Sequence, residues 1–168
     1  MSTIDNFLGN FSIGARSNLY EVNITGDGIS GFDKLAFLCK TAQVPGRTVG
    51  PIEVKYLNHT IKVPGDAVYD DYSITVLHDE DHEVRNGLDE WQQVIIENIE
   101  SKGASEVSQF YKEVQIQQLK RDGSKNPVIY KLMNAWPTAV EPMDLGFDNS
   151  DTILEFGVTF SYSHWVKG

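Results

Sequence analysis

A regular alternation of side chains over residues 151–166 is the feature that most constrains the fold of this chain. Apolar or ring-bearing side chains occupy every second position, at Leu154, Phe156, Val158, Phe160, Tyr162 and His164, and alternate with Glu155, Gly157, Thr159, Ser161 and Ser163. A period of two is typical of a β-strand that buries one face. One strand of about 13 residues would span about 43 Å at ~3.3 Å per residue, which favours a wide, curved sheet. Gly157 is the expected bend.

Length and charge limit the classes of protein to which the chain can belong. With 168 residues, one domain spanning 1–168 can bury roughly 70% of its extended surface. The 14 basic and 24 acidic side chains give a net charge of −10, the wrong sign for gripping nucleic-acid phosphates. No stretch approaches the ~18 apolar residues of a membrane span, and the N-terminus lacks the pattern of a secretory signal. We therefore expect synthesis in a reducing cytoplasm, with the single cysteine, Cys39, buried.

Shorter alternating segments predict further strands, about eight in all. They span 18–25 paired with 33–40, 52–57 paired with 60–63 through a tight turn at Asn58-His59, 69–77, 109–119 and 128–136. Glycine and proline predict loops at 41–51 and 137–149. Residues 1–17 show no period and contain several apolar side chains, so we expect an arm that packs on another subunit.

One segment has the spacing of an amphipathic helix. Val84, Leu88, Trp91, Ile95 and Ile99 recur at steps of three and four, and acidic residues crowd the first turn, where the helix dipole favours them. We predict a helix from about 81 to 100 that ends before Gly103.

Two patterns resemble binding motifs, but their context argues against both. Gly26, Gly28 and Gly31 form a literal GxGxxG, yet the next segment is predicted to return as a strand, so a hairpin loop is expected instead of a dinucleotide site. His78 and His82 resemble a zinc-binding HExxH with Asp in place of Glu, but His78 ends a strand and no third ligand is evident.

Other signs of catalysis are missing from the sequence. No serine lies in a GxSxG turn, and no cysteine lies in a nucleophile signature. The carboxylate pairs at 70–71 and 79–81 are more typical of surface charge, and Trp91 and Trp136 are expected in the core. We expect no enzyme activity, no cofactor and no metal.

Several segments, in order, are similar to a known family. They are Asn18 to Val22, Phe37 to Gly46, Val63 to Asp66, Tyr69 to Tyr72, His78 to His82 and Asn134 to Thr138. Together they resemble the tail tube protein of T4-like contractile-tailed bacteriophages, over about Arg16 to Trp165.

The resemblance implies a mainly β (α+β) fold, an antiparallel β-sandwich or half-barrel with one flanking helix. It also implies that six copies form a ring whose strands join into a shared barrel, and that rings stack into a tube inside a contractile sheath. The tube would be a component of the virion tail, assembled in the host cytoplasm. Its partners would be the sheath, the baseplate or tube initiator and the tail terminator, and DNA would pass through the lumen without specific binding.

Two sets of residues are predicted to serve this assembly. If the apolar faces of the strands are buried, the opposite faces line the lumen, with Asp71, Ser73, Thr75, Glu113, Gln115, Gln117, Glu155, Thr159 and Ser161. This set contains three acids and no base, which would discourage adhesion of DNA. Contacts between subunits are expected from the arm, the 41–51 loop and the hairpin: Phe7, Leu8, Phe11, Val44, Arg47, Val49, Tyr56, Asn58 and His59.

Two other functions stay open at this point. The chain could form the tube, or start the tube, of a phage-derived contractile injection system. From a different class, a monomeric β-barrel that binds a small apolar ligand would also combine long strands with one helix.

Overall fold

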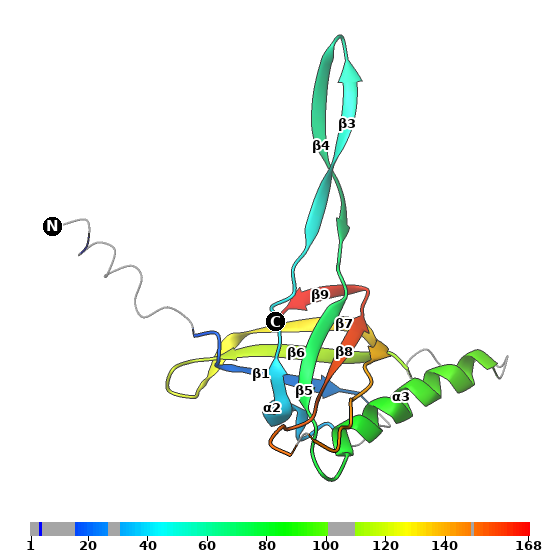
Figure 1. The fold of residues 1–168 in the computed structure, drawn as a ribbon. Helices are drawn as coiled ribbons and strands as arrows, with labels where there is room; N and C mark the ends of the chain where they lie inside the picture. The colour runs from blue at the N-terminus through cyan, green and yellow to red at the C-terminus, as the bar shows by residue number, and fades with distance from the viewer. Residues whose placement is uncertain (1–3, 5–15, 27–30, 101–109, 149) are drawn as a thin grey trace.

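The computed structural model describes residues 4, 16–26, 31–100, 110–148 and 150–168 (Figure 1). The strands are β1 (Tyr20–Thr25), β2 (Cys39–Thr41), β3 (Thr48–Tyr56), β4 (His59–Val68), β5 (Tyr72–Leu77), β6 (Lys112–Leu119), β7 (Lys125–Val140), β8 (Glu155–Ser161) and β9 (His164–Lys167), and the helices are α2 (Leu35–Leu38) and α3 (Glu83–Glu100). Seven strands form one antiparallel sheet in the order β1-β6-β7-β8-β5-β2, with β9 beside β7, whereas β3 and β4 form a separate pair. The expected mainly β fold with one long helix is confirmed.

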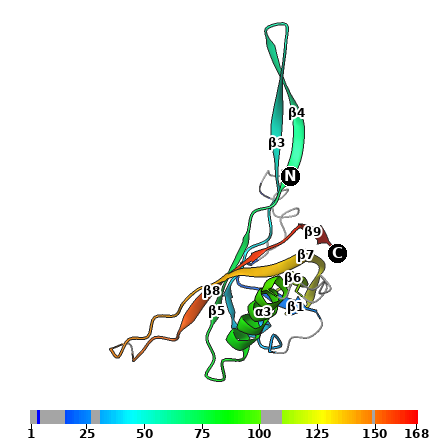
Figure 2. The same ribbon diagram turned by 90° about the vertical axis from the view of Figure 1, so that its right-hand side faces the viewer.

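The seven-stranded sheet bends along β7, so that it has two halves. The first half contains β1, β6, β9 and residues 125–135 of β7, and the second half contains β2, β5, β8 and residues 136–140 of β7. Figures 1 and 2 show the strands of the two halves crossing one another. The outer strands of the halves approach each other, because the Tyr20 hydroxyl of β1 donates a hydrogen bond to the Cys39 carbonyl of β2 at 2.9 Å. The sheet is therefore a nearly closed half-barrel.

One core fills the space between the two halves. Most positions on the predicted apolar faces are buried: Tyr72, Ile74, Val76, Val114, Ile116, Phe156, Val158 and Phe160. Leu154 and Tyr162 are only partly buried. Helix α3 adds Val84, Leu88 and Trp91 to the same core. The helix lies across the side of the sheet where the two halves diverge (Figure 2). The indole of Trp91 donates a hydrogen bond to the Phe110 carbonyl at 2.7 Å, so its one polar atom is satisfied inside the core.

The predicted long strand at 151–166 is wrong as a single element. It divides into β8 and β9 around Tyr162 and Ser163, and both parts pair with β7. Opposite the break, Asn134 has a left-handed backbone with φ 55°. The break shifts the alternation by one position, because His164 is exposed whereas Trp165 packs on the core. The longest strand is β7, with 16 residues.

The β3-β4 hairpin projects far from the body of the molecule (Figures 1 and 2). It is longer than predicted, and its turn is Leu57-Asn58, with φ 45° and 64°, instead of Asn58-His59. This register pairs Glu53 with Lys62 and places Pro51 opposite Pro64. Opposite charges face each other, and the two prolines lack their donors at the same level of the ladder, which explains why the strands continue past the prolines.

Two other predictions of secondary structure are wrong. Residues 33–40 do not return as a partner of β1: they form α2 and the start of β2, and β2 pairs with β5. Leu35 and Leu38 are three apart, a helical spacing, and Leu35 is buried. The loop predicted from Pro137 begins only after Val140, because β7 continues along β8 through Pro137.

Candidate assembly surfaces

The polar face of the second half of the sheet carries six of the nine predicted lumen residues. Ser73, Thr75, Glu155, Thr159 and Ser161 lie on β5 and β8 opposite the buried face, and Asp71 immediately precedes β5. The hydroxyls of Ser73 and Thr159 lie 3.2 Å apart across the paired strands, and the Thr138 hydroxyl donates to the Thr159 carbonyl at 3.0 Å. This face is a short ladder of hydroxyl groups with a carboxylate at one end.

The other three predicted lumen residues lie on the first half. Glu113 and Gln115 of β6 are partly exposed, whereas Gln117 is buried and donates a hydrogen bond from Nε2 to the Asn126 carbonyl at 2.6 Å. Glu113 lies 3.5 Å from Lys131, and Glu21 lies 2.9 Å from Lys125. Acids and bases are balanced on this face.

The two groups of residues do not share one surface. Because the apolar faces of both halves meet in one core, their polar faces point away from each other. Lysines of neighbouring strands also enter both faces: Lys131 pairs with Glu113, and Lys40 pairs with Glu155. Sequence reasoning missed these lysines, because the alternation of a strand does not tell which strands lie beside it.

The predicted contact residues outside the N-terminal arm are exposed in the single chain. They are Val44, Arg47, Val49, Tyr56, Asn58 and His59. Arg47 also lies over the Trp165 ring, 5.1 Å from its centroid, and the Trp165 indole donates to the Gly46 carbonyl at 3.0 Å. These contacts fix the base of the hairpin to β9. Phe7, Leu8 and Phe11 lie outside the described residues.

The histidine pair does not form a metal-binding arrangement. The ring centroids of His78 and His82 lie 4.2 Å apart in an edge-to-face contact. Burial is the main cause that lowers the pKa of His78, and the nearby His82 adds to it. Over the ranges that the structure describes, no three His, Cys, Asp or Glu side chains are placed to hold a metal ion.

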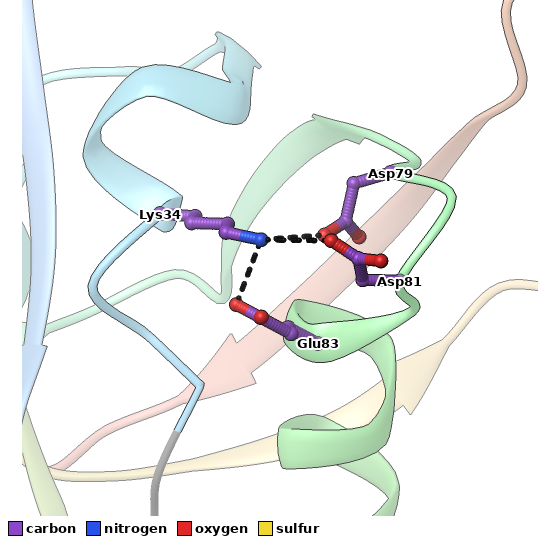
Figure 3. A network of polar contacts seen from close by, with 4 residues as sticks. All are labelled: Lys34, Asp79, Asp81 and Glu83. Atoms are coloured by element: carbon purple, nitrogen blue, oxygen red, sulfur yellow. Dashed lines mark hydrogen bonds and ion pairs between the residues drawn. The ribbon is translucent and has the colours of Figure 1, made fainter.

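The acidic side chains beside these histidines form ion pairs with a lysine. Lys34, just before α2, lies 3.6 Å from Asp79, 3.2 Å from Asp81 and 3.0 Å from Glu83 (Figure 3). Hydrogen bonds to Glu83 and Asp81 raise the pKa of Lys34. The cluster links α2 to the start of α3, which is a structural role.

One cavity of about 600 Å³ lies outside the core, on the connection between β7 and β8. Residues 142, 144–147 and 152–155 line it. Within the described part of the chain, no helix has the length and apolar character to cross a bilayer.

Comparison with known proteins identifies relatives of this chain. The model of a family described as "Phage tail tube protein" matches residues 10–167. The chain is 29% identical to tail tube protein gp19 of Enterobacteria phage T4 over 151 residues, 90% of each chain. It is 28% identical to tail tube protein gp19 of Enterobacteria phage T6 over the same share.

Solved structures share the fold at low sequence identity. The tube-terminating cap of the anti-feeding prophage has a TM-score of 0.68 and 16% identity, with 94% of this chain and 92% of that chain covered. The sheath/tube terminator of the extracellular contractile injection system PVC has a TM-score of 0.66 and 13% identity, with 94% and 98% covered.

Proposed function

Because the chain belongs to the phage tail tube protein family, we propose that it builds the inner tube of a contractile phage tail as stacked hexameric rings. The tube is a structural part of the virion and a conduit for DNA during ejection. This function needs no active site, and the relatives in the family are structural proteins.

The observation that carries the proposal is a pair of open strand edges in the second half. Among the described residues, β2 ends the sheet on one side, and residues 137–140 of β7 pair with β8 but not with β6 on the other. Unpaired edges are templates for strand addition. When the β2 edge of one copy meets the β7 edge of the next, a head-to-tail contact repeats, and a closed ring leaves no edge exposed.

The lumen is assigned to the polar face of the second half. The strands β2 and β5 lead directly into the β3-β4 hairpin, and Figure 1 shows β5 running in the direction of the hairpin. A wall made of these strands runs along the direction in which rings stack. Its hydroxyl ladder at Ser73 and Thr159 offers DNA phosphates no cation, and Lys40 is paired with Glu155.

The remaining partners follow from the same assembly. The first half and α3 then face outward to a contractile sheath, and the two ends of the tube meet a baseplate initiator and a terminator. The arm residues Phe7, Leu8 and Phe11 stay predicted contacts between copies. The virion tail is the final location, after assembly in the host cytoplasm.

Seeded assembly tests this function. Purified protein is mixed with a small amount of sonicated polymer or of initiator complex and then examined by negative-stain microscopy and sedimentation. Six-fold rings and hollow tubes are the expected products. A chain that remains monomeric in both seeded and unseeded reactions contradicts the proposal and favours the ligand-binding barrel.

A tube of a contractile injection system is the second candidate. The fold similarity to the prophage cap and the injection-system terminator favours it, whereas the sequence similarity over 90% of the chain is to phage proteins. Neighbouring genes for capsid and DNA packaging would support the phage tail, and neighbouring toxin genes without a capsid would support the injection system.

A further inference from the structure

Both connections between the β3-β4 hairpin and the sheet contact one short segment of the chain. The first root of the hairpin, residues 42–47, joins β2 to β3, and the second root, residues 69–71, joins β4 to β5. The first root contacts Trp165 and the second contacts Tyr162. These two aromatic residues lie on either side of Ser163. The segment at which the sheet passes from one half to the other therefore also contacts both roots of the hairpin.

The first root is bound at both ends, once by each half of the sheet. Near its start, the Tyr72 hydroxyl of β5 donates a hydrogen bond to the Gln43 carbonyl at 2.7 Å. Near its end, the Trp165 indole of β9 donates to the Gly46 carbonyl at 3.0 Å. The Arg47 guanidinium lies 5.1 Å from the centroid of the same ring. A backbone acceptor and a cation on neighbouring residues thus use the N–H and the face of one indole, which restricts the rotation of this root.

The second root is bound by an aromatic pair. The Tyr69 and Tyr162 rings lie edge to face, with their centroids 6.1 Å apart, which is a favourable geometry for two aromatic rings. Tyr162 also packs against the core. Because the two roots contact different side chains of the body, the contacts together restrict both the tilt and the rotation of the hairpin.

The rings that receive the roots are fixed in the body of the molecule. Trp165 and Tyr130 of β7 lie edge to face with 5.5 Å between their centroids, and both pack against the core. On the same aromatic group, the Lys167 ammonium lies 6.0 Å from the centroid of Tyr130. The hairpin is therefore attached to side chains that belong to the folded body.

The length of the hairpin makes its direction sensitive to these contacts. Strand β3 has nine residues, which span about 30 Å at ~3.3 Å per residue, and the hairpin projects from the body in both views (Figures 1 and 2). A tilt of about 10° at the roots would move the turn by about 5 Å at this length. A hairpin that tilts freely would occupy many directions, and restricting it to one direction on assembly would cost conformational entropy.

We propose that Tyr162 and Trp165 form a clamp that sets the direction of the hairpin in the free subunit, before any other copy is bound. This inference rests on the proposed tube and identifies the residues that prepare a subunit to join it. Because the clamp restricts the hairpin in advance, less ordering remains to be done at the moment of association. Tyr162 and Trp165 are positioning residues, since they act through the hairpin.

Distances within the free subunit test the clamp without any tube. Nitroxide labels are placed on Thr60→Cys, near the turn of the hairpin, and on Glu90→Cys of α3, which are both exposed positions. Double electron–electron resonance then gives the spread of distances between the hairpin and the body. Cys39 stays unlabelled because it is buried. A narrow distribution is expected for the chain that carries only the two labels.

Substitutions at the contacts release the hairpin but keep the core filled. The triple variant Arg47→Ala/Tyr69→Ala/Trp165→Phe removes the cation, one ring of the aromatic pair and the indole N–H, and it retains an aromatic ring at position 165. Its distance distribution should be about twofold wider, because the roots then act as flexible connections. Lys167→Ala is the matched control, since it removes a cation from the same aromatic group without touching a root, and its distribution should stay narrow.

Seeded elongation measures what the clamp contributes to assembly. The triple variant should need about tenfold more protein than the wild type to elongate from seeds, because the hairpin must be ordered during association. The Lys167→Ala variant should elongate at the wild-type concentration. Circular dichroism of the free subunits checks that all of these variants are folded.

The outcomes separate the clamp from the tube function. Equal distance distributions in the triple variant and the wild type overturn the clamp, whether or not tubes form, and so does a Lys167→Ala distribution as wide as that of the triple variant. A wider distribution with unchanged elongation overturns the role of the clamp in assembly. A wild-type chain that does not elongate from seeds contradicts the tube function instead, and the distance distributions then decide on the clamp alone.

Discussion

The side-chain amide of Asn134 donates a hydrogen bond to the Ser163 hydroxyl at 3.3 Å, at the level where two paired strands change from one half of the sheet to the other. The Ser163 amide also donates to the Met133 carbonyl at 3.1 Å. On each side of this level the pairing of residues 130–137 of β7 with residues 160–167 keeps the same register. The bend is therefore a local reversal of faces in both strands, held by a residue with a left-handed backbone.

Substitution of Asn134 tests how much the left-handed backbone at this position affects the free energy of unfolding. Asn134→Ala should unfold about 1–2 kcal/mol more easily than the wild type, because alanine keeps the Cβ that opposes the left-handed conformation and loses the amide that bonds Ser163. Asn134→Gly should lose less than about 1 kcal/mol, because glycine adopts that conformation freely. Urea unfolding of the three proteins measures the order, and equal stability of the Ala and Gly variants would contradict the role of the backbone.

Reversing the charge of one glutamate on each half of the sheet tests which half lines the lumen of the tube. Glu155→Lys should leave tubes intact but slow DNA ejection from virions built with the variant, most strongly at low ionic strength, because a cation now faces the phosphates. Glu113→Lys is the matched control, since both glutamates are paired with a lysine. Ejection that is slowed by Glu113→Lys alone would move the lumen to the first half.

The environment of His78 predicts a loss of stability in acid. Both ring nitrogens are buried and have no hydrogen-bond partner among the described residues. Burial, with His82 and Arg85 nearby, lowers the pKa of His78 below its usual value near 6.5, and Asp79 only partly opposes this. Below about pH 6.5 the unfolded chain therefore binds a proton that the folded chain does not, and the free energy of unfolding falls as the pH falls.

Replacing the imidazole isolates this effect. His78→Phe should lower the dependence of urea unfolding on pH between about 7 and 5, whereas His59→Gln, at an exposed hairpin position, should leave it unchanged. An unchanged slope in His78→Phe would show that other groups cause the acid sensitivity.

Cys39 should be unreactive in the folded chain. It is buried, and burial raises the pKa of its thiol to about 12. Since the thiolate is the nucleophile, alkylation by iodoacetamide at pH 8 should be on the order of a thousandfold slower in the native protein than in urea. Equal rates in the two conditions would show that β2 detaches readily from β5.

The sequence could predict the core far better than the path of the strands. Alternation correctly identified buried positions such as Ile74, Val114 and Phe160, because burial on one face is a property of a strand and its own residues. The break at Tyr162 and Ser163 could not be predicted from the segment's own residues. It lies opposite Asn134, a residue with a left-handed backbone on the partner strand β7.

The other wrong predictions have the same cause, because they also depend on which segments lie beside each other. The segment that leads to Cys39 pairs with β5 and not with β1, and pairing between distant segments leaves little trace in a single sequence. The lumen residues stay a prediction, now divided between two faces, because which face meets a channel is decided by copies of the chain and not by one copy.

The continuity of β7 also gives the subunit a direction of mechanical strength. A pull along the hairpin enters β5 through the backbone and passes to β8 and then β7 through antiparallel ladders. Hydrogen bonds of such ladders lie across the strands, so a pull along the strands loads them together in shear instead of opening them one by one. A column of these subunits under axial load should therefore separate between copies before any single subunit unfolds.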